Sequence, residues 1–234
     1  MAAAAQDDFE FKALDEARNY RRALLREFAP FLRGRVLEVG AGIGQFTEGL
    51  LDLLTLKELV CVEPCRHFCE IFRLRYPATT LVEGTAQEVS RETPWDAILS
   101  VNVLEHIEND ELELATYRDF LRERGGRLCL FVPARREIYA PIDKQFGHFR
   151  RYARAELDEE LRRNGFQVLR LRYFNIAGYF GWWFTFCFLK KRSFDPAAVR
   201  FFDRCIFPVV NYFETSFAFP PFGQSLLAVA RALP

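Results

Sequence analysis

The stretch "RVLEVGAGIGQF", residues 35–46, runs from an apolar segment directly into a loop with three glycines. The valines and leucine before the loop are typical of a buried β-strand, and a helical pattern follows Gly44. Glycines at 40, 42 and 44 allow a sharp turn and let a ligand approach the backbone where any Cβ would collide. A helix starting near Gln45 would direct free N–H groups at that ligand. The stretch therefore predicts a strand, a ligand-binding turn and a helix.

Two common nucleotide-binding motifs do not fit this stretch. A dinucleotide-binding fingerprint requires glycine at position 45, where the chain has Gln45. A phosphate-binding P-loop requires a Gly-Lys-Ser/Thr ending, which the stretch lacks. The pattern is instead acid-x-Gly-x-Gly-x-Gly, with Glu38 as the acid. A nicotinamide-dependent oxidoreductase is therefore disfavoured and stays the rival enzyme class.

Short apolar runs alternate with helical patterns along the chain. The predicted strands span residues 35–40, 58–63, 79–84, 96–101, 127–132, 166–174 and 225–233. The predicted helices lie within residues 9–32, 45–54, 65–76, 109–124 and 154–165. Because a parallel crossover usually folds as a helix, this order predicts a mostly parallel sheet covered on both faces.

The composition restricts the partners and the location of the protein. Lys plus Arg and Asp plus Glu both number 32, so no overall positive field favours a nucleic-acid partner. The six cysteines are expected to be reduced thiols, because a core of this size needs no disulfide framework. Cys61, Cys65 and Cys69 follow a helical spacing without a matching Cys or His pair, so no metal site is predicted. The N-terminus lacks the features of a signal peptide, which predicts a cytoplasmic protein.

The glycine-rich loop resembles the first motif of class I S-adenosylmethionine-dependent methyltransferases. The resemblance implies S-adenosylmethionine as the cofactor, with its methionine part bound by this loop. It also implies that Glu38 holds the ammonium group of that part, where a dinucleotide would present pyrophosphate. Glu63, at the end of the second predicted strand, would accept both ribose hydroxyls.

Three later stretches resemble further motifs of the same family. "EGTAQEV" (83–89) resembles the adenine-binding motif, although Thr85 stands where the family usually has an acid. "PWDAILSVNVLEHIEND" (94–110) resembles the fourth motif, and "RGGRLCLFVPA" (124–134) fits the strand after it. The cofactor-binding residues implied in this way are Glu38, Gly40, Ala41, Gly42, Gly44, Gln45, Glu63, Pro64, Thr85, Ala86, Asn102 and Val103.

The resemblance also implies the fold. The implied fold is a three-layer, Rossmann-like α/β fold with a seven-stranded sheet, mostly parallel with an antiparallel C-terminal strand. The family usually joins the last two strands by a short connection, so the long aromatic stretch before the last strand is predicted to be an insertion. At 234 residues, we expect a single domain. Its predicted parts are an N-terminal helical segment (1–33), a cofactor-binding core (34–133), a lid loop (134–153) and an aromatic acceptor-side insertion (174–223).

Catalysis would depend on few residues. Methyl transfer from a sulfonium needs mainly alignment of the reacting atoms, and a hydroxyl acceptor also benefits from a base, for which histidine is best suited near neutral pH. His67 is predicted on a helix surface, His106 in the turn after the fourth strand and His148 in the lid loop. We predict His148 as the acceptor-side base or orienting group, with Asp143 and His106 as further catalytic candidates.

Arg151 and Tyr152 of the lid loop are predicted to bind the acceptor. Together with Arg150, Arg151 would suit an anionic acceptor, because guanidinium groups match carboxylate and phosphate. The alternative is a lid held by surface ion pairs, which contribute little energy.

Residues 174–223 hold two of the three tryptophans and many of the 25 phenylalanines. The longest uncharged run, 175–189, is too short to cross a bilayer as a helix. Three interpretations stay open: a hydrophobic cap on the core, an apolar acceptor pocket or homodimer face, and peripheral membrane contact through residues 176–192. Each favours a hydrophobic or lipid-linked acceptor.

Together these features predict methyl transfer from S-adenosylmethionine to a small hydrophobic or lipid-linked acceptor, with oxygen favoured as the acceptor atom. A nucleic-acid adenine methyltransferase would carry an Asn/Asp-Pro-Pro-aromatic turn after the fourth strand, where this chain has "SVNVLE" (100–105). The alternatives are the nicotinamide-dependent oxidoreductase and, because of Thr85, a catalytically inactive partner subunit that binds the cofactor.

Overall fold

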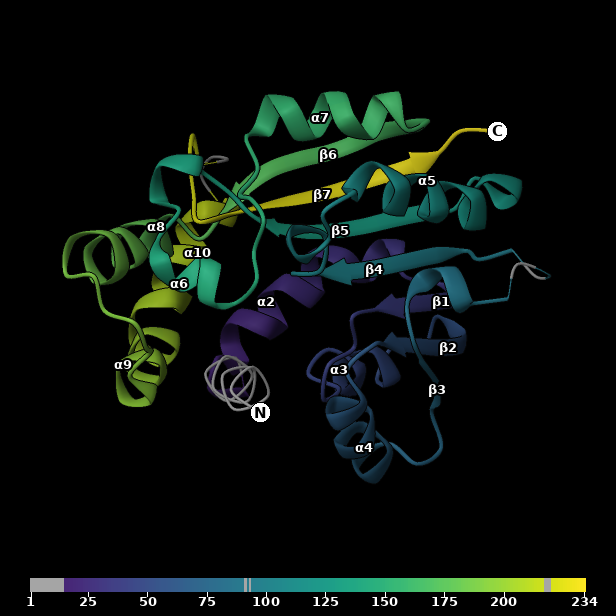
Figure 1. The fold of residues 1–234 in the computed structure, drawn as a ribbon, viewed down its shortest axis with the longest axis horizontal. Coiled ribbons are helices and arrows are strands. Elements are labelled where there is room, and N and C mark those ends of the chain that lie inside the picture. Colours follow the sequence, from purple (N-terminus) through teal and green to yellow (C-terminus); the bar gives the residue numbers. More distant parts are fainter. Residues whose placement is uncertain (1–14, 91, 93, 217–219) are drawn as a thin grey trace.

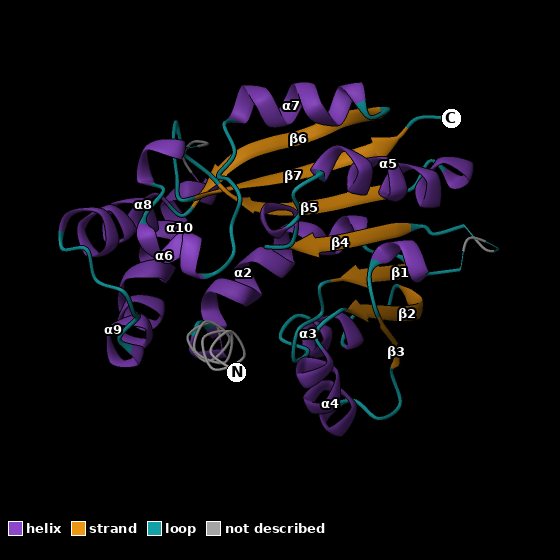
Figure 2. Cartoon of the chain, viewed as in Figure 1, coloured by secondary structure: helices purple, strands orange, loops and turns teal. Residues whose placement is uncertain are grey.

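The apolar runs of the sequence form one seven-stranded sheet in a computed structural model that describes residues 15–90, 92, 94–216 and 220–234 (Figures 1 and 2). The strands are β1 (Gly34–Val39), β2 (Leu56–Glu63), β3 (Thr80–Glu83), β4 (Ala97–Val101), β5 (Arg127–Pro133), β6 (Phe166–Phe174) and β7 (Ser225–Ala232). Their order is β3-β2-β1-β4-β5-β7-β6; β1 to β5 are parallel, and β7 is antiparallel to both of its neighbours. This confirms the predicted fold class.

Helices and short helical turns connect the strands. The α-helices are α2 (Arg18–Phe28), α3 (Thr47–Leu51), α4 (Arg66–Arg75), α5 (Asp110–Leu121), α6 (Pro141–Gln145), α7 (Arg154–Arg163), α8 (Ile176–Trp182), α9 (Pro196–Phe201) and α10 (Phe207–Ser216). The 3-10 turns are η1 (Ala29–Phe31), η2 (Ala86–Glu88), η3 (Leu104–His106), η4 (Arg122–Arg124) and η5 (Arg136–Ile138), and two π-helical segments are η6 (Trp183–Phe188) and η7 (Phe202–Ile206).

Neighbouring residues of each strand point to opposite faces of the sheet, and both faces are buried. Leu37 and Ile98 belong to the core cluster that contains the apolar residues of α5 and α7. Val36 and Leu99 belong to the opposite cluster, which contains the apolar residues of α2, α3 and α10. The strands therefore form the middle of three layers.

Two helices differ from the sequence prediction. The helix predicted over 45–54 is only the five residues of α3, because the glycine-rich loop continues as turns up to Phe46. The N-terminal helix was predicted within 9–32, and its described part is helical at residues 15 and 16, is interrupted at Ala17, and continues as α2 and then η1. Pro30 has no N–H to continue the α-helical hydrogen bonds, which accounts for the change to η1. Residues 9–14 of that prediction lie outside the described residues.

The lid loop carries more structure than its sequence indicated. It contains η5 and α6, and the buried residues Ile138 and Ile142 pack against Trp182 and Phe186 of the insertion. The insertion itself folds as α8, η6, α9, η7 and α10, which gather beside α6 and α2 at the carboxyl edge of the parallel strands (Figure 1). The lid and the insertion thus form one structure over that edge.

A buried carboxylate fastens the insertion to the N-terminal helix. Asp203, only 2% exposed, accepts hydrogen bonds from the backbone N–H groups of Asn19 (3.0 Å) and Tyr20 (2.9 Å). No side chain of α2 itself caps this helix start, so Asp203 of η7 satisfies donors that would otherwise be unpaired. The position of the insertion is therefore coupled to α2.

Asp203→Ala is expected to lower the free energy of unfolding by about 1–3 kcal/mol, because two backbone donors lose a buried acceptor. Chemical denaturation measures this difference. Asp195→Ala is the matched control: Asp195 caps α9 at an exposed site by accepting from Ala197, and its loss should cost about 1 kcal/mol or less. Equal costs for the two substitutions would contradict an anchoring role for Asp203.

Candidate active site

The glycine-rich loop follows β1 and adopts a backbone that side chains disfavour. Gly40 and Gly44 have φ angles of +73° and +91°. A Cβ on Gly40 would lie 2.3 Å from Val103 Cγ2, and one on Gly44 would lie 2.1 Å from Tyr76 Cε2. The loop therefore needs glycine at these positions for its own packing. The absence of side chains also leaves the backbone accessible to a ligand.

Glu38 is a buried acid at the end of β1, only 3% exposed. Its carboxylate accepts hydrogen bonds from Thr47 Oγ1 (2.6 Å) and Cys61 Sγ (3.3 Å). Burial raises the pKa of Glu38 to about 7, the nearby charge of Glu63 acts in the same direction, and the two hydrogen bonds oppose the rise. A cation placed next to Glu38 would therefore favour loss of its proton.

Glu63 ends β2 and faces the same loop. Its Oε2 accepts the N–H of Gly42 (2.8 Å), and its Oε1 accepts the N–H of Cys65 (2.9 Å). These two bonds fix the carboxylate at the strand end, where the sequence predicted the acceptor for the ribose hydroxyls. The role itself stays a prediction.

Thr85 has a structural role in the turn after β3. Its side chain caps η2 together with Glu88, whose carboxylate also accepts the backbone N–H of Thr85. Ala86, the next residue, is buried in the core. A capping role accounts for threonine at this position. The contact of Thr85 and Ala86 with the adenine stays a prediction.

Asn102 follows β4 with a left-handed backbone, φ +52°, a conformation that asparagine tolerates better than most side chains. Its backbone N–H donates to the Phe131 carbonyl (2.9 Å), which ties the turn to β5. The turn then leads into η3. A strained backbone of this kind persists only where the surrounding structure holds it, and such residues are frequent at functional sites.

A cavity of about 440 Å³ lies between the strand ends and the insertion. Asn102, Glu105 and Pro133 contribute its wall on the sheet side, and His148 and Arg151 contribute from the lid. The insertion adds many apolar side chains, among them Trp182, Phe186, Phe194, Val199, Phe201, Phe202 and Ile206. The structure therefore brings the predicted lid residues and the aromatic insertion to one cavity.

Asp143 and His148 form a buried pair within the lid. Asp143 Oδ1 lies 3.1 Å from His148 Nδ1, and Asp143 Oδ2 accepts the Ala140 N–H (2.8 Å). Burial alone would raise the pKa of Asp143, but the hydrogen bond with His148 and the charge of Arg151 outweigh it and hold this pKa below its usual value. Asp143 is therefore a charged group that orients the imidazole of His148.

Arg151 and Tyr152 are engaged inside the protein. Arg151 donates to Asp143 Oδ1 from Nε (2.9 Å) and Nη2 (2.8 Å), and its guanidinium lies 4.5 Å from the centre of the Trp182 ring. The Tyr152 hydroxyl donates to Asp110 Oδ2 (2.8 Å). Ion pairs thus hold the lid as in the alternative interpretation, but at buried positions. Acceptor binding by Arg151 and Tyr152 stays a prediction.

The other two histidines lie in different surroundings. His67 is exposed on α4, as predicted. The ring of His106 lies 4.6 Å from that of His148, in a T-shaped arrangement. Loss of solvation and the neighbouring His148 lower the pKa of His106 to about 4, while a hydrogen bond with the Phe146 backbone acts in the opposite direction. These effects favour the neutral form of the His106 imidazole.

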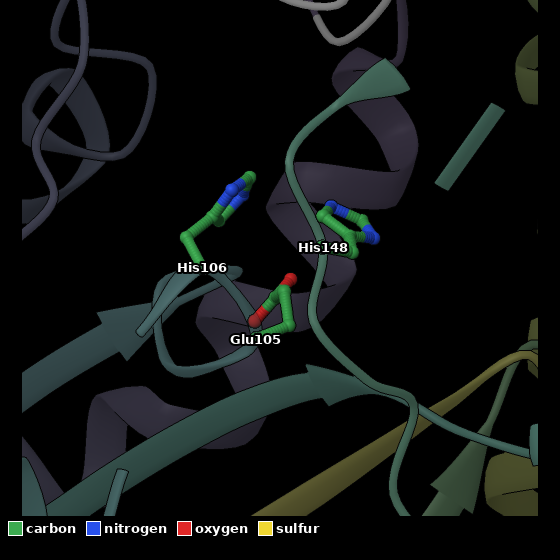
Figure 3. A group of neighbouring side chains, drawn as sticks. All are labelled: Glu105, His106 and His148. Carbon is green, nitrogen blue, oxygen red and sulfur yellow. The ribbon is translucent and has the colours of Figure 1, made fainter. Parts of the chain in front are cut away.

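Sequence reasoning missed Glu105. Its side chain is fully buried, lines the cavity, and lies between His106 and His148 (Figure 3). The available signal was an acid next to His106, in the turn that follows the fourth predicted strand.

The sequence matches a protein family described as "Methyltransferase domain" over residues 13–171, which is more than half of the chain. The chain belongs to this methyltransferase family. None of the curated proteins matches the sequence.

Solved structures share the fold of this methyltransferase at low sequence identity. A putative methyltransferase from Bacillus halodurans C-125 is 18% identical, with 92% of this chain and 99% of that chain covered and a TM-score of 0.63. An S-adenosylmethionine-dependent methyltransferase from Archaeoglobus fulgidus is 17% identical, with 92% and 94% covered and a TM-score of 0.59. N-methyltransferase NodS from Bradyrhizobium japonicum WM9 is 14% identical, with 94% and 97% covered and a TM-score of 0.57.

The family implies S-adenosylmethionine as the cofactor, and the residues at the strand ends fit it. The bare backbone at Gly40 and Gly42 suits close approach of a ligand, and the acids Glu38 and Glu63 suit a ligand that carries an ammonium and ribose hydroxyls. When bound, the cofactor supplies an electrophilic methyl group on a positively charged sulfur. The family also sets aside the nicotinamide-dependent oxidoreductase.

The affinity of the methyltransferase for S-adenosylmethionine is expected to rise from about pH 6 to about pH 8. Glu38 is partly protonated below its pKa of about 7, and binding of an ammonium favours the carboxylate, so binding releases a proton. Calorimetry in buffers with different ionisation enthalpies counts that proton. Glu38→Gln should bind more weakly and without this linkage; the same pH dependence in both proteins would remove Glu38 as its source.

Proposed function

We propose that this methyltransferase transfers the methyl group of S-adenosylmethionine to a hydroxyl oxygen of a small hydrophobic or lipid-linked acceptor. The observation that carries the proposal is the cavity that opens between the carboxyl edge of the sheet and the aromatic insertion. Ligands of open α/β sheets bind at this edge, so an acceptor in the cavity would lie beside the cofactor-binding residues.

The apolar walls of the cavity support a hydrophobic acceptor. Apolar atoms provide most of the lining surface, although the lining also includes polar residues beyond Asn102, Glu105, His148 and Arg151, namely Asn175, Thr185, Lys191, Ser193, Asp195, Asp203, Gln224 and Ser225. An acceptor with an extended apolar part would gain binding energy from burial along these walls. A free sugar would leave most of them without a favourable contact.

His148 supports oxygen as the acceptor atom. Asp143 fixes Nδ1 of His148, so Nε2 is the ring atom available to take or direct a hydroxyl proton. The N-methyltransferase with the same fold leaves an amine acceptor as the second candidate.

His148→Ala is expected to lower turnover at least tenfold while the affinity for S-adenosylmethionine stays unchanged, because His148 lines the acceptor cavity. A panel of hydroxylated lipids and quinones, with release of the demethylated cofactor as the readout, measures the effect. His67→Ala, on the exposed face of α4, is the control and should keep wild-type turnover.

Two results would count against the proposed function. Methylation of amines alone would change the acceptor atom. Tight cofactor binding without turnover on any acceptor would favour the inactive partner subunit, the alternative that the threonine at position 85 raised.

We further propose that the insertion meets a membrane surface from which the acceptor enters. Phe180, Trp183, Phe184 and Phe188 are all about half exposed or more, and their spacing places them on one face of α8 and η6. The opposite face is buried through Trp182 and Phe186. The helix is thus apolar on both sides, which a simple cap on the core does not explain.

Charge near this exposed face fits an anionic lipid surface. Lys190, Lys191 and Arg192 follow η6 directly and are all exposed. Aromatic side chains beside basic residues are typical of segments that lie in the membrane interface. Within the described residues, none of the helices is long and apolar enough to cross a bilayer. The cytoplasmic location stays a prediction.

Trp183→Ser combined with Phe184→Ser is expected to release the protein from vesicles, because two apolar anchors are lost. Co-sedimentation with anionic vesicles measures the bound fraction, which should fall several-fold. Leu74→Ser, an exposed site on α4, is the control and should bind like the wild type. Wild-type protein left in the supernatant, together with self-association in light scattering, would identify the face as a homodimer interface instead.

A further inference from the structure

Three potential metal ligands, Glu105, His106 and His148, lie together where Glu105 and His148 line the cavity. A carboxylate oxygen of Glu105 and a ring nitrogen of each histidine lie within 4.8 Å of one another. Figure 3 shows the three side chains converging from two segments, η3 and the loop after α6. Two imidazoles and one carboxylate form a recurrent ligand set for divalent transition metals.

The backbone holds the two segments in register. The Phe149 N–H donates to the Glu105 carbonyl (2.8 Å), which joins the lid to η3 at the residues beside the ligands. The Tyr139 hydroxyl donates to the His148 carbonyl (2.8 Å), and the His148 N–H donates to the Asp143 carbonyl (2.9 Å). The ligand atoms are therefore positioned before any ion binds.

The outer contacts of the histidines are those that metal-binding histidines usually make. Asp143 engages Nδ1 of His148, and Asp143 is itself fixed by Arg151 and by the Ala140 N–H. This leaves Nε2 of His148, which is buried and has no hydrogen-bond partner among the described residues. The Phe146 backbone bonds the ring of His106 in the same manner. A carboxylate or carbonyl behind the ring orients the imidazole and strengthens it as a ligand.

We propose that Glu105, His106 and His148 bind one divalent transition metal ion of the zinc class, with Asp143 as a positioning residue behind His148. Imidazole ligands favour zinc and its neighbours over magnesium or calcium, which prefer oxygen ligands alone. The sequence analysis predicted no metal site on the basis of the cysteine spacing, and no cysteine belongs to this cluster.

The open coordination position faces the acceptor. Glu105 and His148 both line the cavity, so an ion between them would be accessible to a hydroxyl bound there. This part rests on the proposed function. With Nε2 of His148 bound to the ion, that nitrogen cannot also take the hydroxyl proton. The ion instead lowers the pKa of the coordinated hydroxyl, which releases its proton to water before the oxygen forms its bond to the methyl carbon and the carbon–sulfur bond breaks.

The test is direct binding of Zn²⁺ and Co²⁺ to protein first treated with a chelator. Calorimetry should show one Zn²⁺ per chain, and Co²⁺ should produce the visible absorption of a low-coordinate nitrogen–oxygen site. His106→Ala and Glu105→Gln should each weaken Zn²⁺ binding by at least about 100-fold, since loss of outer partners alone costs about 10–100-fold. His67→Ala should bind like the wild type, and Mg²⁺ should not compete.

Three results would overturn the proposal. One is the absence of stoichiometric binding to the wild type. Another is unchanged binding in both variants while cofactor affinity and unfolding midpoints remain at wild-type values. The third is a thiolate-to-cobalt charge-transfer band, which would assign the ion to cysteine.

The binding test is independent of the proposed function. If methylation persists in the presence of a chelator and no metal binds, the metal proposal is wrong and the proposed function still stands. If a metal binds through these residues but no hydroxyl acceptor is methylated, the metal site stands and the proposed function is wrong.

Discussion

The parallel strands β1 to β5 end at one edge of the sheet, and this constraint determines where every functional side chain lies. The chain passes from β1 outward to β2 and β3, then returns to β4 and β5 on the other side of β1. The order therefore reverses between β1 and β4, and the connections that follow these two strands leave in opposite directions. The glycine-rich loop and Asn102 flank that point.

Contact between the two loops at this point is close. The room for a Cβ on Gly40 is taken by Val103, one residue after Asn102. The turn after β1 and the turn after β4 are thus fixed relative to each other by packing, and not only by the strands that carry them. Alignment of two reactants is the main contribution that a protein makes to methyl transfer, and rigid contact of this kind supports it.

The two buried acids Glu38 and Asp143 have different electrostatic surroundings. Glu38 has neutral partners, a hydroxyl and a thiol, so burial dominates and raises its pKa. Asp143 is also buried, but Arg151 and His148 contact it directly, so its pKa falls. The first acid can respond to an incoming cation, whereas the second maintains a fixed orientation of its histidine.

The sequence predicted the sheet well because local patterns determine strands. The predicted range of β6, 166–174, is the observed one, and the reversed direction of β7 was implied by the family resemblance. The helix after the glycine-rich loop was overestimated, because the loop's turns extend beyond its last glycine. The approach of Glu105 and His106 to His148 was not predictable, since it depends on how a forty-residue path returns to η3.

The site residues show the same division. Glu38 was recognisable from its place before the three glycines, and Glu63 from its place at the end of the second predicted strand. Glu63 contacts the loop through Gly42, and Glu38 contacts the start of α3 through Thr47. The buried contacts of Arg151 with Asp143 and of Tyr152 with Asp110 could not be predicted from the sequence, because they form only when the lid folds against its neighbours.

The two ends of the aromatic insertion lie next to each other. Phe174, the last residue of β6, pairs with Ser225, the first residue of β7. Whatever connects two neighbouring antiparallel strand ends can change in length or sequence without altering the strands, because the closure entropy of a loop grows only slowly with its length. The length and sequence of the cavity-lining insertion can therefore change without displacing the strand ends that carry the glycine-rich loop and Asn102.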